Sequence, residues 1–177
     1  MRITVSGPPG SGTTTLARRL AGRTGFRLIS AGEVFRALAA ERGMDLAAFG
    51  ALAEADQSID LLIDERQREI AEATDDIVVE GRLSGRMVTC ADLRIWLQAP
   101  LPVRVRRILE REAGADLASA EAETAEREAC EARRYRQYYG IEIDDLLPYD
   151  LVLNSDRFGI EALGAIVEAA IESRHQR

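Results

Sequence analysis

The segment that most constrains the fold is Gly7-Pro8-Pro9-Gly10-Ser11-Gly12-Thr13-Thr14, which directly follows the apolar run Ile3–Ser6. It matches the pattern GxxxxG-x-[ST], in which glycines let the backbone curl so that successive N–H groups point at phosphate oxygens. The helix expected from Thr13 adds its positive N-terminal end. A strand, a glycine-rich loop and a helix in this order predict a phosphate-binding loop, with the Thr14 hydroxyl at the position that usually ligates Mg²⁺.

Thr13 departs from the usual motif, because it stands where most loops of this kind carry lysine. The chain contains no lysine, and its 23 basic residues are all arginine. Thr13 supplies no charge, but its hydroxyl can donate a hydrogen bond to a phosphate oxygen, and we predict a catalytic role for it. The alternative is a Gly/Pro loop without a ligand. Cationic phosphate contacts must therefore come from arginine, whose planar fork suits them, or from the single His175.

Composition argues against several classes of protein. The net charge of −7 makes the chain as a whole a poor partner for nucleic acid. Cys90 and Cys130 lie far apart and there is one histidine, which argues against zinc, haem and Ser–His–Asp chemistry. No apolar run approaches the length of a membrane span, so no membrane partner is expected. Two cysteines without a secretory signal predict a reduced, cytoplasmic protein, and we expect a monomer.

Strand-like and helix-like patterns alternate along the 177 residues, which predicts one α/β domain with a parallel sheet flanked by helices. The expected strands are Ile3–Ser6, Arg27–Ser30, Ile77–Val79, Leu93–Leu97 and Leu151–Leu153. Helical periodicity predicts helices over Thr13–Ala21, Leu46–Ala55 and Ile59–Ala73, another from Leu101, and a last one over Ile160–Ile171. Ser30, three residues before Glu33, predicts a capping box at the start of a further helix.

Two arginines are placed to hold a second phosphate. Arg36 lies on the helix after the second strand, and Arg82 follows Glu80-Gly81 at the end of the third. Both are expected at the carboxyl edge of the sheet, where open α/β folds bind ligands. The alternative for each is an ordinary surface arginine. Glu80 is placed to hold Mg²⁺ through water, or else to form a local ion pair.

Residues 113–140 are rich in Glu, Arg and Ala and contain few large apolar residues before Tyr135. This composition predicts a helix that buries little, which is either a solvated surface helix or a lid that closes over a substrate. Arg107 and Arg111 share a helix face just before it, and further arginines lie within it. Phosphoryl transfer needs positive charge around the moving group. We therefore assign Arg107 to nucleotide binding, and Arg111, Arg127 and Arg134 to catalysis.

At this point the sequence resembles the archaeal type of cytidylate kinase, over essentially the whole chain. The fragments that carry the resemblance are GPPGSGTTT (Gly7–Thr15), ISAGEVFR (Ile29–Arg36), VVEGRLSG (Val78–Gly85), ADLRIWLQAP (Ala91–Pro100), RYRQYYGIEIDDL (Arg134–Leu146) and YDLVLNS (Tyr149–Ser155).

The resemblance implies a P-loop nucleoside triphosphate hydrolase-type fold with a five-stranded parallel core. The core would comprise about residues 1–30, 74–112 and 141–177, with acceptor-binding helices over 31–73 and a lid over 113–140. It also implies transfer of the γ-phosphoryl group of ATP, with Mg²⁺, to CMP or dCMP. By resemblance, Gly7–Thr15 would bind the ATP phosphates, Arg36 and Arg82 with Ser30 and Gly81 would bind the acceptor, and Arg127 and Arg134 match lid arginines.

Two other functions remain open at this stage. One is a small-molecule P-loop kinase with a different acceptor, such as AMP, UMP or shikimate. The other is a nucleotide-binding regulatory module without turnover, which the missing lysine supports. The residues that would read the acceptor base are not placed by the sequence.

Overall fold

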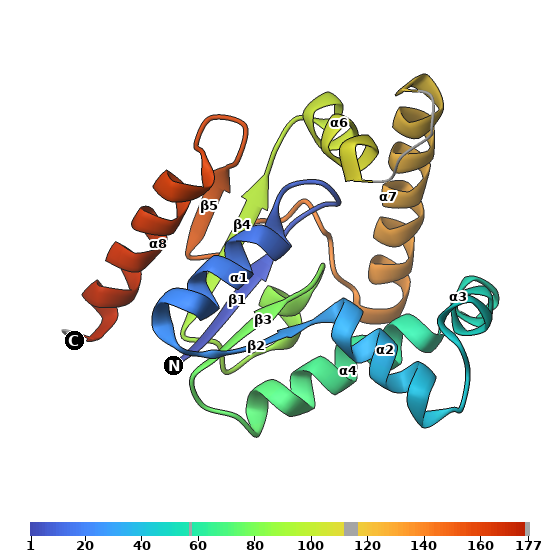
Figure 1. Cartoon of the computed structure of the whole chain (residues 1–177), viewed down its shortest axis with the longest axis horizontal. Coiled ribbons are helices and arrows are strands. Elements are labelled where there is room, and N and C mark those ends of the chain that lie inside the picture. The colour runs from blue at the N-terminus through green and yellow to red at the C-terminus, as the bar shows by residue number, and fades with distance from the viewer. Residues whose placement is uncertain (57, 112–116, 176–177) are drawn as a thin grey trace.

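A five-stranded parallel sheet with strand order β2-β3-β1-β4-β5 forms the centre of the chain (Figure 1). The structure is a computed structural model that describes residues 1–56, 58–111 and 117–175. The strands are β1 (Arg2–Ser6), β2 (Arg27–Ser30), β3 (Ile77–Glu80), β4 (Leu93–Gln98) and β5 (Leu151–Asn154). This sheet confirms the fold class predicted from the sequence, because β1 at its centre runs directly into the glycine-rich loop.

Helices lie on both faces of the sheet and beyond one edge of it. The helices are α1 (Thr13–Thr24), α2 (Ala31–Glu41), α3 (Leu46–Ala55), α4 (Ser58–Glu72), α5 (Ser84–Met87), α6 (Leu101–Arg111), α7 (Leu117–Tyr139) and α8 (Ile160–His175). Figure 1 shows α2, α3 and α4 grouped below the sheet, with α7 standing beside the carboxyl edge. In the part of the chain that the structure describes, no helix has the length and apolar character that a membrane span requires.

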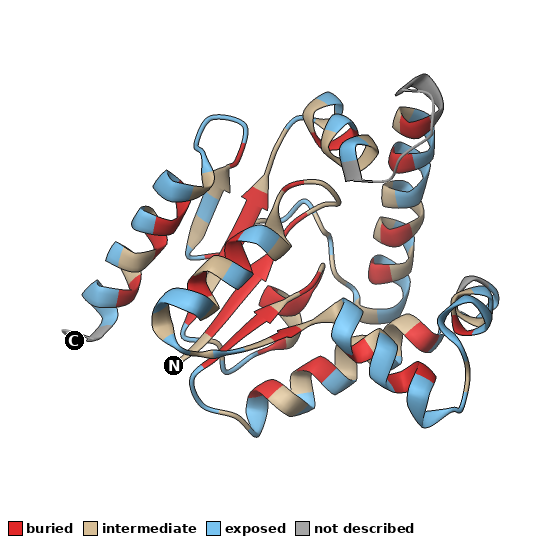
Figure 2. Cartoon of the chain, in the orientation of Figure 1, coloured by how far each residue is buried: buried red, intermediate tan, exposed pale blue. Residues whose placement is uncertain are grey.

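The core is divided between the two faces of the sheet, as the alternation of side chains along a strand requires. In β3, Val78 packs with α1 and α8 on one face, whereas Ile77 and Val79 pack with α2, α3 and α4 on the other. Figure 2 shows the central strands β1, β3 and β4 as the most continuously buried part of the chain. Since the central strands are buried on both sides, their carboxyl ends form a fixed platform for the loops that follow them.

Local signals placed most element boundaries correctly. The Ser30–Glu33 capping box is present, with both of its reciprocal hydrogen bonds. Helix α1 runs three residues further than predicted, to Thr24, because Gly25 in the left-handed conformation (φ 76°) caps it there. The short α5 was not predicted, since four residues are too few to show a helical period.

Helix α7 buries more than its composition predicted. Ala120, Thr124, Glu131 and Tyr135 are all buried. Two of these four side chains are polar or charged, and Glu131 is held by ion pairs rather than by apolar packing. An apolar count underestimates the burial of such a helix, because ion-paired carboxylates contribute nothing to that count. Residues 113–116 of the predicted lid lie outside the described residues.

Candidate active site

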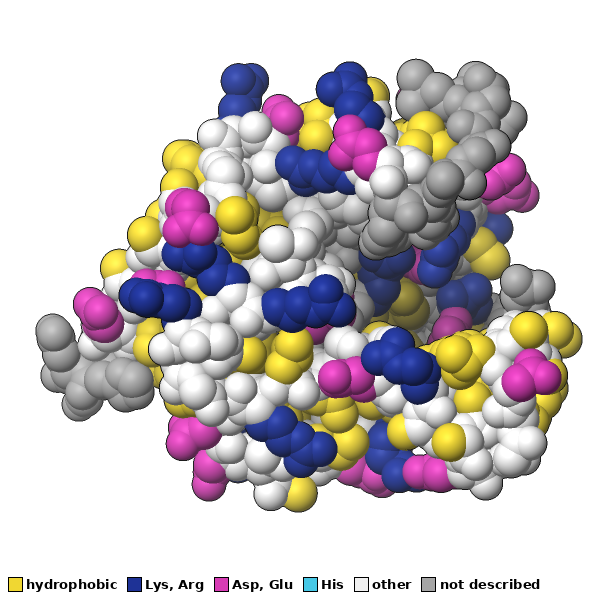
Figure 3. All heavy atoms as spheres, viewed as in Figure 1, with side chains coloured by type: hydrophobic (Ala, Val, Ile, Leu, Met, Phe, Trp, Pro, Cys, Tyr) yellow, Lys and Arg dark blue, Asp and Glu magenta, His cyan; other side chains and the backbone are white. Residues whose placement is uncertain are grey.

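A cavity of about 570 Å³ opens at the carboxyl edge of the sheet, between the glycine-rich loop, α4 and α7. Figure 3 shows a hollow on this face with arginine side chains along its wall. The lining residues come from all the predicted functional segments, and they include Gly7, Pro9, Gly10, Gly12, Thr13, Thr14, Thr15, Ala31, Gly32, Asp60, Asp64, Glu80, Gly81, Arg82, Arg107, Arg127, Glu131, Arg134 and Tyr135. The fold therefore brings together the loop, the end of β3 and the predicted lid helix.

The glycine-rich loop has a backbone that only glycine can follow at its key positions. Gly10 (φ 74°) and Gly12 (φ 96°) are in the left-handed region, and Gly12 is the N-cap of α1. A Cβ at Gly10 would lie 2.5 Å from the Arg104 carbonyl oxygen, and a Cβ at Gly7 would lie 2.2 Å from the Leu97 carbonyl oxygen. The loop thus passes directly against the backbone of β4 and α6, which fixes its course.

Two arginines of α6 tie this loop to its surroundings. Arg107 donates from Nη1 to the Gly10 carbonyl oxygen at 3.3 Å, and from both Nη atoms to Ser155. Ser155 in turn donates from Oγ to the Ser11 carbonyl oxygen at 2.7 Å. Arg104, which the sequence did not single out, donates to the carbonyl oxygens of Pro9 and Ala99. Of the predicted nucleotide-binding residues, Pro8 lines a neighbouring cavity instead, and Ser11 is buried, with no hydrogen-bond partner for its hydroxyl among the described atoms.

The predicted metal ligands are Thr14, in the first turn of α1, and Glu80, the last residue of β3. Thr13 donates from Oγ1 to Glu80 Oε1 at 2.8 Å, and its hydrogen bond to a phosphate oxygen stays a prediction. Thr14 and Glu80 both line the cavity. Across the described ranges, no group of three or more His, Cys, Asp and Glu side chains is arranged to share a metal ion. A hydroxyl and one carboxylate fit an ion such as Mg²⁺ that keeps its waters and is held mainly by substrate phosphates.

The predicted acceptor residues divide into two groups. Gly81 and Arg82 line the cavity, and Arg82 donates from Nη1 to the Gly7 carbonyl oxygen at 3.0 Å. Ser30 caps α2, and neither Ser30 nor Arg36 is among the residues that line the cavity. Arg36 is exposed beside Gly32, which does line it, and no described residue pairs with its guanidinium. Arg82 is therefore positioned by the fold, whereas Arg36 is left free.

Two of the three predicted catalytic arginines of the lid region face the cavity from α7. Arg134 pairs from Nη2 with Asp60 Oδ2 at 2.5 Å, and its side chain is largely buried. Arg127 is 70% exposed and donates from Nε to Glu131 Oε1 at 3.1 Å. The side chain of Arg111 lies outside the described residues. Arg127 and Arg134 are thus both held by carboxylates at the cavity wall.

Acidic side chains on α4 and α7 form a part of the site that the sequence analysis missed. Asp60 and Asp64 lie one turn apart on α4, and Asp64 accepts a hydrogen bond at 3.2 Å from the Tyr139 hydroxyl. Burial raises the pKa of Asp60, although the Arg134 guanidinium opposes this. Burial also raises the pKa of Asp64, to about 7. The sequence signal was available, since two acids four residues apart directly follow the apolar Ile59 and Ile63 on the same helix.

Replacing Asp64 by asparagine should stabilise the protein at neutral pH but not in acid. Asp64 has a pKa of about 7 in the folded protein, against an ordinary value of 3.8, so folding binds a proton at pH values between the two. The destabilisation due to Asp64 is therefore absent below pH 4, grows as the pH rises and is complete above pH 7. Each pKa unit corresponds to 1.36 kcal/mol, so we expect a gain of about 2–4 kcal/mol at pH 8.

Urea unfolding of Asp64→Asn and the unmodified protein at pH 4 and pH 8 would test this expectation. Glu172→Gln removes an exposed carboxylate from α8 and serves as the control, with little change expected at either pH. An equal effect of Asp64→Asn at both pH values would show that ionisation of Asp64 is not the cause.

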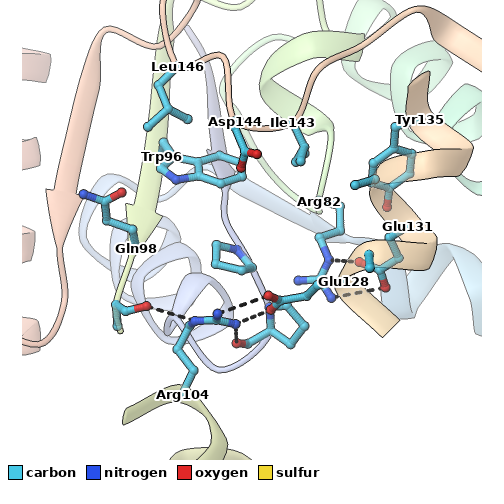
Figure 4. A pocket seen from close by; sticks show the side chains of 15 residues that line it. Arg82, Trp96, Gln98, Arg104, Glu128, Glu131, Tyr135, Ile143, Asp144 and Leu146 are labelled. Carbon is cyan, nitrogen blue, oxygen red and sulfur yellow. Dashed lines mark hydrogen bonds and ion pairs between the residues drawn. The ribbon is translucent and has the colours of Figure 1, made fainter. Parts of the chain in front are cut away.

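A second cavity of about 410 Å³ lies on the other side of the loop prolines (Figure 4). Trp96 and Gln98 at the end of β4, the segment from Ile143 to Leu146, and α7 form its walls. Figure 4 shows two ion pairs reaching from α7 to the core here, Glu128 with Arg104 and Glu131 with Arg82. Only the second pair also lines the first cavity, so the two acids of α7 have different surroundings.

Comparison with known proteins gives a consistent result. The profile described as the cytidylate kinase-like family matches residues 2–157. The chain is 62% identical over 171 residues to the cytidylate kinase of Methanosphaerula palustris, covering 97% of each chain. It is 66% identical to that of Methanoculleus marisnigri, covering 97% of this chain and 94% of the relative. Among solved structures, the shikimate kinase of Bacteroides thetaiotaomicron superposes with a TM-score of 0.66 at 16% identity, covering 97% and 98% of the two chains, and this supports the fold alone.

Proposed function

Because the chain belongs to the cytidylate kinase-like family, we propose that it transfers the γ-phosphoryl group of ATP to CMP or dCMP, giving ADP and CDP or dCDP. The observation that carries this proposal is the cavity, which joins a phosphate-binding loop to a second group of residues that includes Arg82. Two phosphorylated substrates can meet there with their phosphates between the loop and α7.

The donor would bind along the loop and the N-terminus of α1. The backbone of Gly7–Thr15 would hold the ATP phosphates, and Arg107 keeps the loop in place through the Gly10 carbonyl. Mg²⁺, which neutralises charge on the β- and γ-phosphates when bound, would be held by the Thr14 hydroxyl and through water by Glu80. Thr13 adds a hydroxyl that is polarised by Glu80 and can turn to a phosphate oxygen.

The acceptor would lie between the end of β3 and α4. Arg82 offers its guanidinium to the acceptor phosphate, and Arg36 could swing in from the exposed face of α2. The base would then reach towards Asp60 and Asp64 on α4, which line this end of the cavity. Arg127 and Arg134, placed on a helix between α6 and β5, would stabilise the transferring group when the lid closes.

An acceptor panel tests the proposal directly. We expect Mg²⁺-dependent ADP release from ATP with CMP and dCMP, slower release with UMP, and poor release with AMP, GMP and shikimate. A buried acceptor aimed at the exocyclic amino group of cytosine would lie unpaired opposite the carbonyl of uracil, which costs about 1–3 kcal/mol or roughly 5- to 150-fold.

Other outcomes would point to other functions. Preference for AMP or UMP would keep the kinase and reject the cytidylate assignment, and activity with shikimate alone would reject a monophosphate acceptor. ATP binding without any acceptor-dependent release would favour a regulatory module. The shikimate kinase of Acinetobacter baumannii, at 13% identity, shares the fold and gives no reason to expect shikimate as substrate.

A further inference from the structure

The cavity that we assign to two phosphorylated substrates has no excess of positive charge. Its lining contains four arginines, Arg82, Arg107, Arg127 and Arg134, and four acidic residues, Asp60, Asp64, Glu80 and Glu131. Three of these arginines are already paired with carboxylates, and the fourth donates to Ser155 and a backbone carbonyl. A polyanion that binds these arginines through the N–H groups now in use therefore competes with their present partners.

Glu131 is the resident group with the most specific arrangement. Its side chain is only 10% exposed, and both oxygens are occupied. Oε2 accepts from Arg82 Nε at 2.7 Å, while Oε1 accepts from Arg82 Nη2 at 3.4 Å and from Arg127 Nε at 3.1 Å. The guanidinium contacts of Arg82 and Arg127 hold the pKa of Glu131 below its usual range, although burial raises it. The group is therefore an anion clamped between two arginines.

This arrangement is the one expected for a phosphate. A carboxylate and a phosphate accept the same bidentate pair of N–H groups from the fork of an arginine. Arg82 also donates from Nη1 to the Gly7 carbonyl oxygen, and this hydrogen bond fixes the guanidinium beside the loop. Arg82 comes from the end of β3 and Arg127 from α7, so Glu131 joins the core to α7 through the arginines assigned to substrate phosphates.

We propose that Glu131 is a built-in anion that occupies the acceptor-phosphate position on Arg82 and is displaced when that phosphate binds. The identity of the phosphate as that of the acceptor rests on the proposed function, whereas the anion site on Arg82 does not depend on it. A buried carboxylate that loses both arginines is left without compensation. Glu131 must then turn towards solvent or move with α7, so acceptor binding is coupled to a movement of the helix. Glu131 in this way sets the affinity for the acceptor.

The test compares Glu131→Gln with a matched control on the same helix. Glu128→Gln removes the carboxylate one turn earlier, which pairs with Arg104 and lies outside the first cavity. Binding of inorganic phosphate is measured by calorimetry, and KM and kcat for CMP are measured in parallel. We expect Glu131→Gln to bind phosphate about tenfold more tightly and to show a similarly lower KM for CMP. Glu128→Gln should leave phosphate affinity unchanged, and Arg82→Ala combined with Glu131→Gln should abolish the gain.

Weaker or unchanged phosphate binding in Glu131→Gln would overturn the proposal, because Glu131 would then position Arg82 or only support α7. A gain that persists without Arg82 would also overturn it, since the phosphate would be binding elsewhere, for example on the glycine-rich loop. Tighter phosphate binding in a protein that phosphorylates no CMP would leave the proposal standing and reject the proposed function.

Discussion

Replacing Arg134 by alanine is expected to lower kcat by about a thousandfold or more, with a much smaller change in the affinity for ATP. This is the scale of an arginine that stabilises charge on a transferring phosphoryl group. Arg134 lines the cavity from α7, and an ion pair with Asp60 at 2.5 Å holds its guanidinium at the cavity wall. Arg134→Lys should not restore the rate, because an ammonium cannot reproduce the planar fork. Single-turnover measurements with saturating ATP and CMP would separate the chemical step from binding.

Arg133 provides a matched control for this prediction. It is the neighbouring residue on α7, is exposed, and is absent from the residues that line the cavity. Arg133→Ala should therefore leave kcat within a few-fold of the unmodified protein. Arg127→Ala belongs in the same series, since Arg127 also lines the cavity. Unchanged kcat in both Arg127→Ala and Arg134→Ala would remove the arginines of α7 from the mechanism.

The fold could be predicted from the sequence because its signals are local. The strand Ile3–Ser6, the glycine-rich loop and the capping box at Ser30 each specify a short stretch of backbone independently of the rest. Alternation along the chain then fixes a parallel sheet, because strands joined through helices cannot pair as hairpins. What failed was also local: the four residues of α5 are too few to carry a periodic pattern, and a Gly cap three residues beyond the expected end extended α1.

The site was only partly predictable because the partners of each arginine come from distant segments. The motif identified the loop, and position at a strand end identified Arg82, which does line the cavity. The sequence could not show that Glu131, 49 residues away, pairs with the guanidinium of Arg82, or that Asp60 pairs with Arg134. For Arg36, a position after a strand does not decide whether an exposed side chain points into the cavity, and its role in acceptor binding stays a prediction. Charge pairing across elements depends on the tertiary fold, and no pattern within one element encodes it.

Replacing the half-buried Gly10 by alanine is expected to disrupt the phosphate loop severely. Gly10 has φ 74°, a conformation that costs roughly 1–2 kcal/mol for an L-residue. The new Cβ would lie 2.5 Å from the carbonyl oxygen of Arg104 and 2.9 Å from its Cα. Both neighbours are backbone atoms of α6, so no side chain can turn away, and overpacking adds about 1–3 kcal/mol. We expect stability to fall by about 2–5 kcal/mol and ATP affinity to fall at least about tenfold.

Gly22→Ala supplies the control, because it makes the same substitution in α1, the helix that follows the loop. Gly22 lies within α1, is exposed, and has nothing within 4 Å of the added Cβ. Gly22→Ala should stabilise the protein by up to about 1 kcal/mol through the helix propensity of alanine and leave ATP affinity unchanged. Urea unfolding and an ATP titration on both variants give the comparison. If Gly10→Ala matched Gly22→Ala in stability and bound ATP normally, the loop would have to yield at Arg104. That result would contradict the claim that close packing of Gly10 against the backbone of α6 shapes the phosphate site.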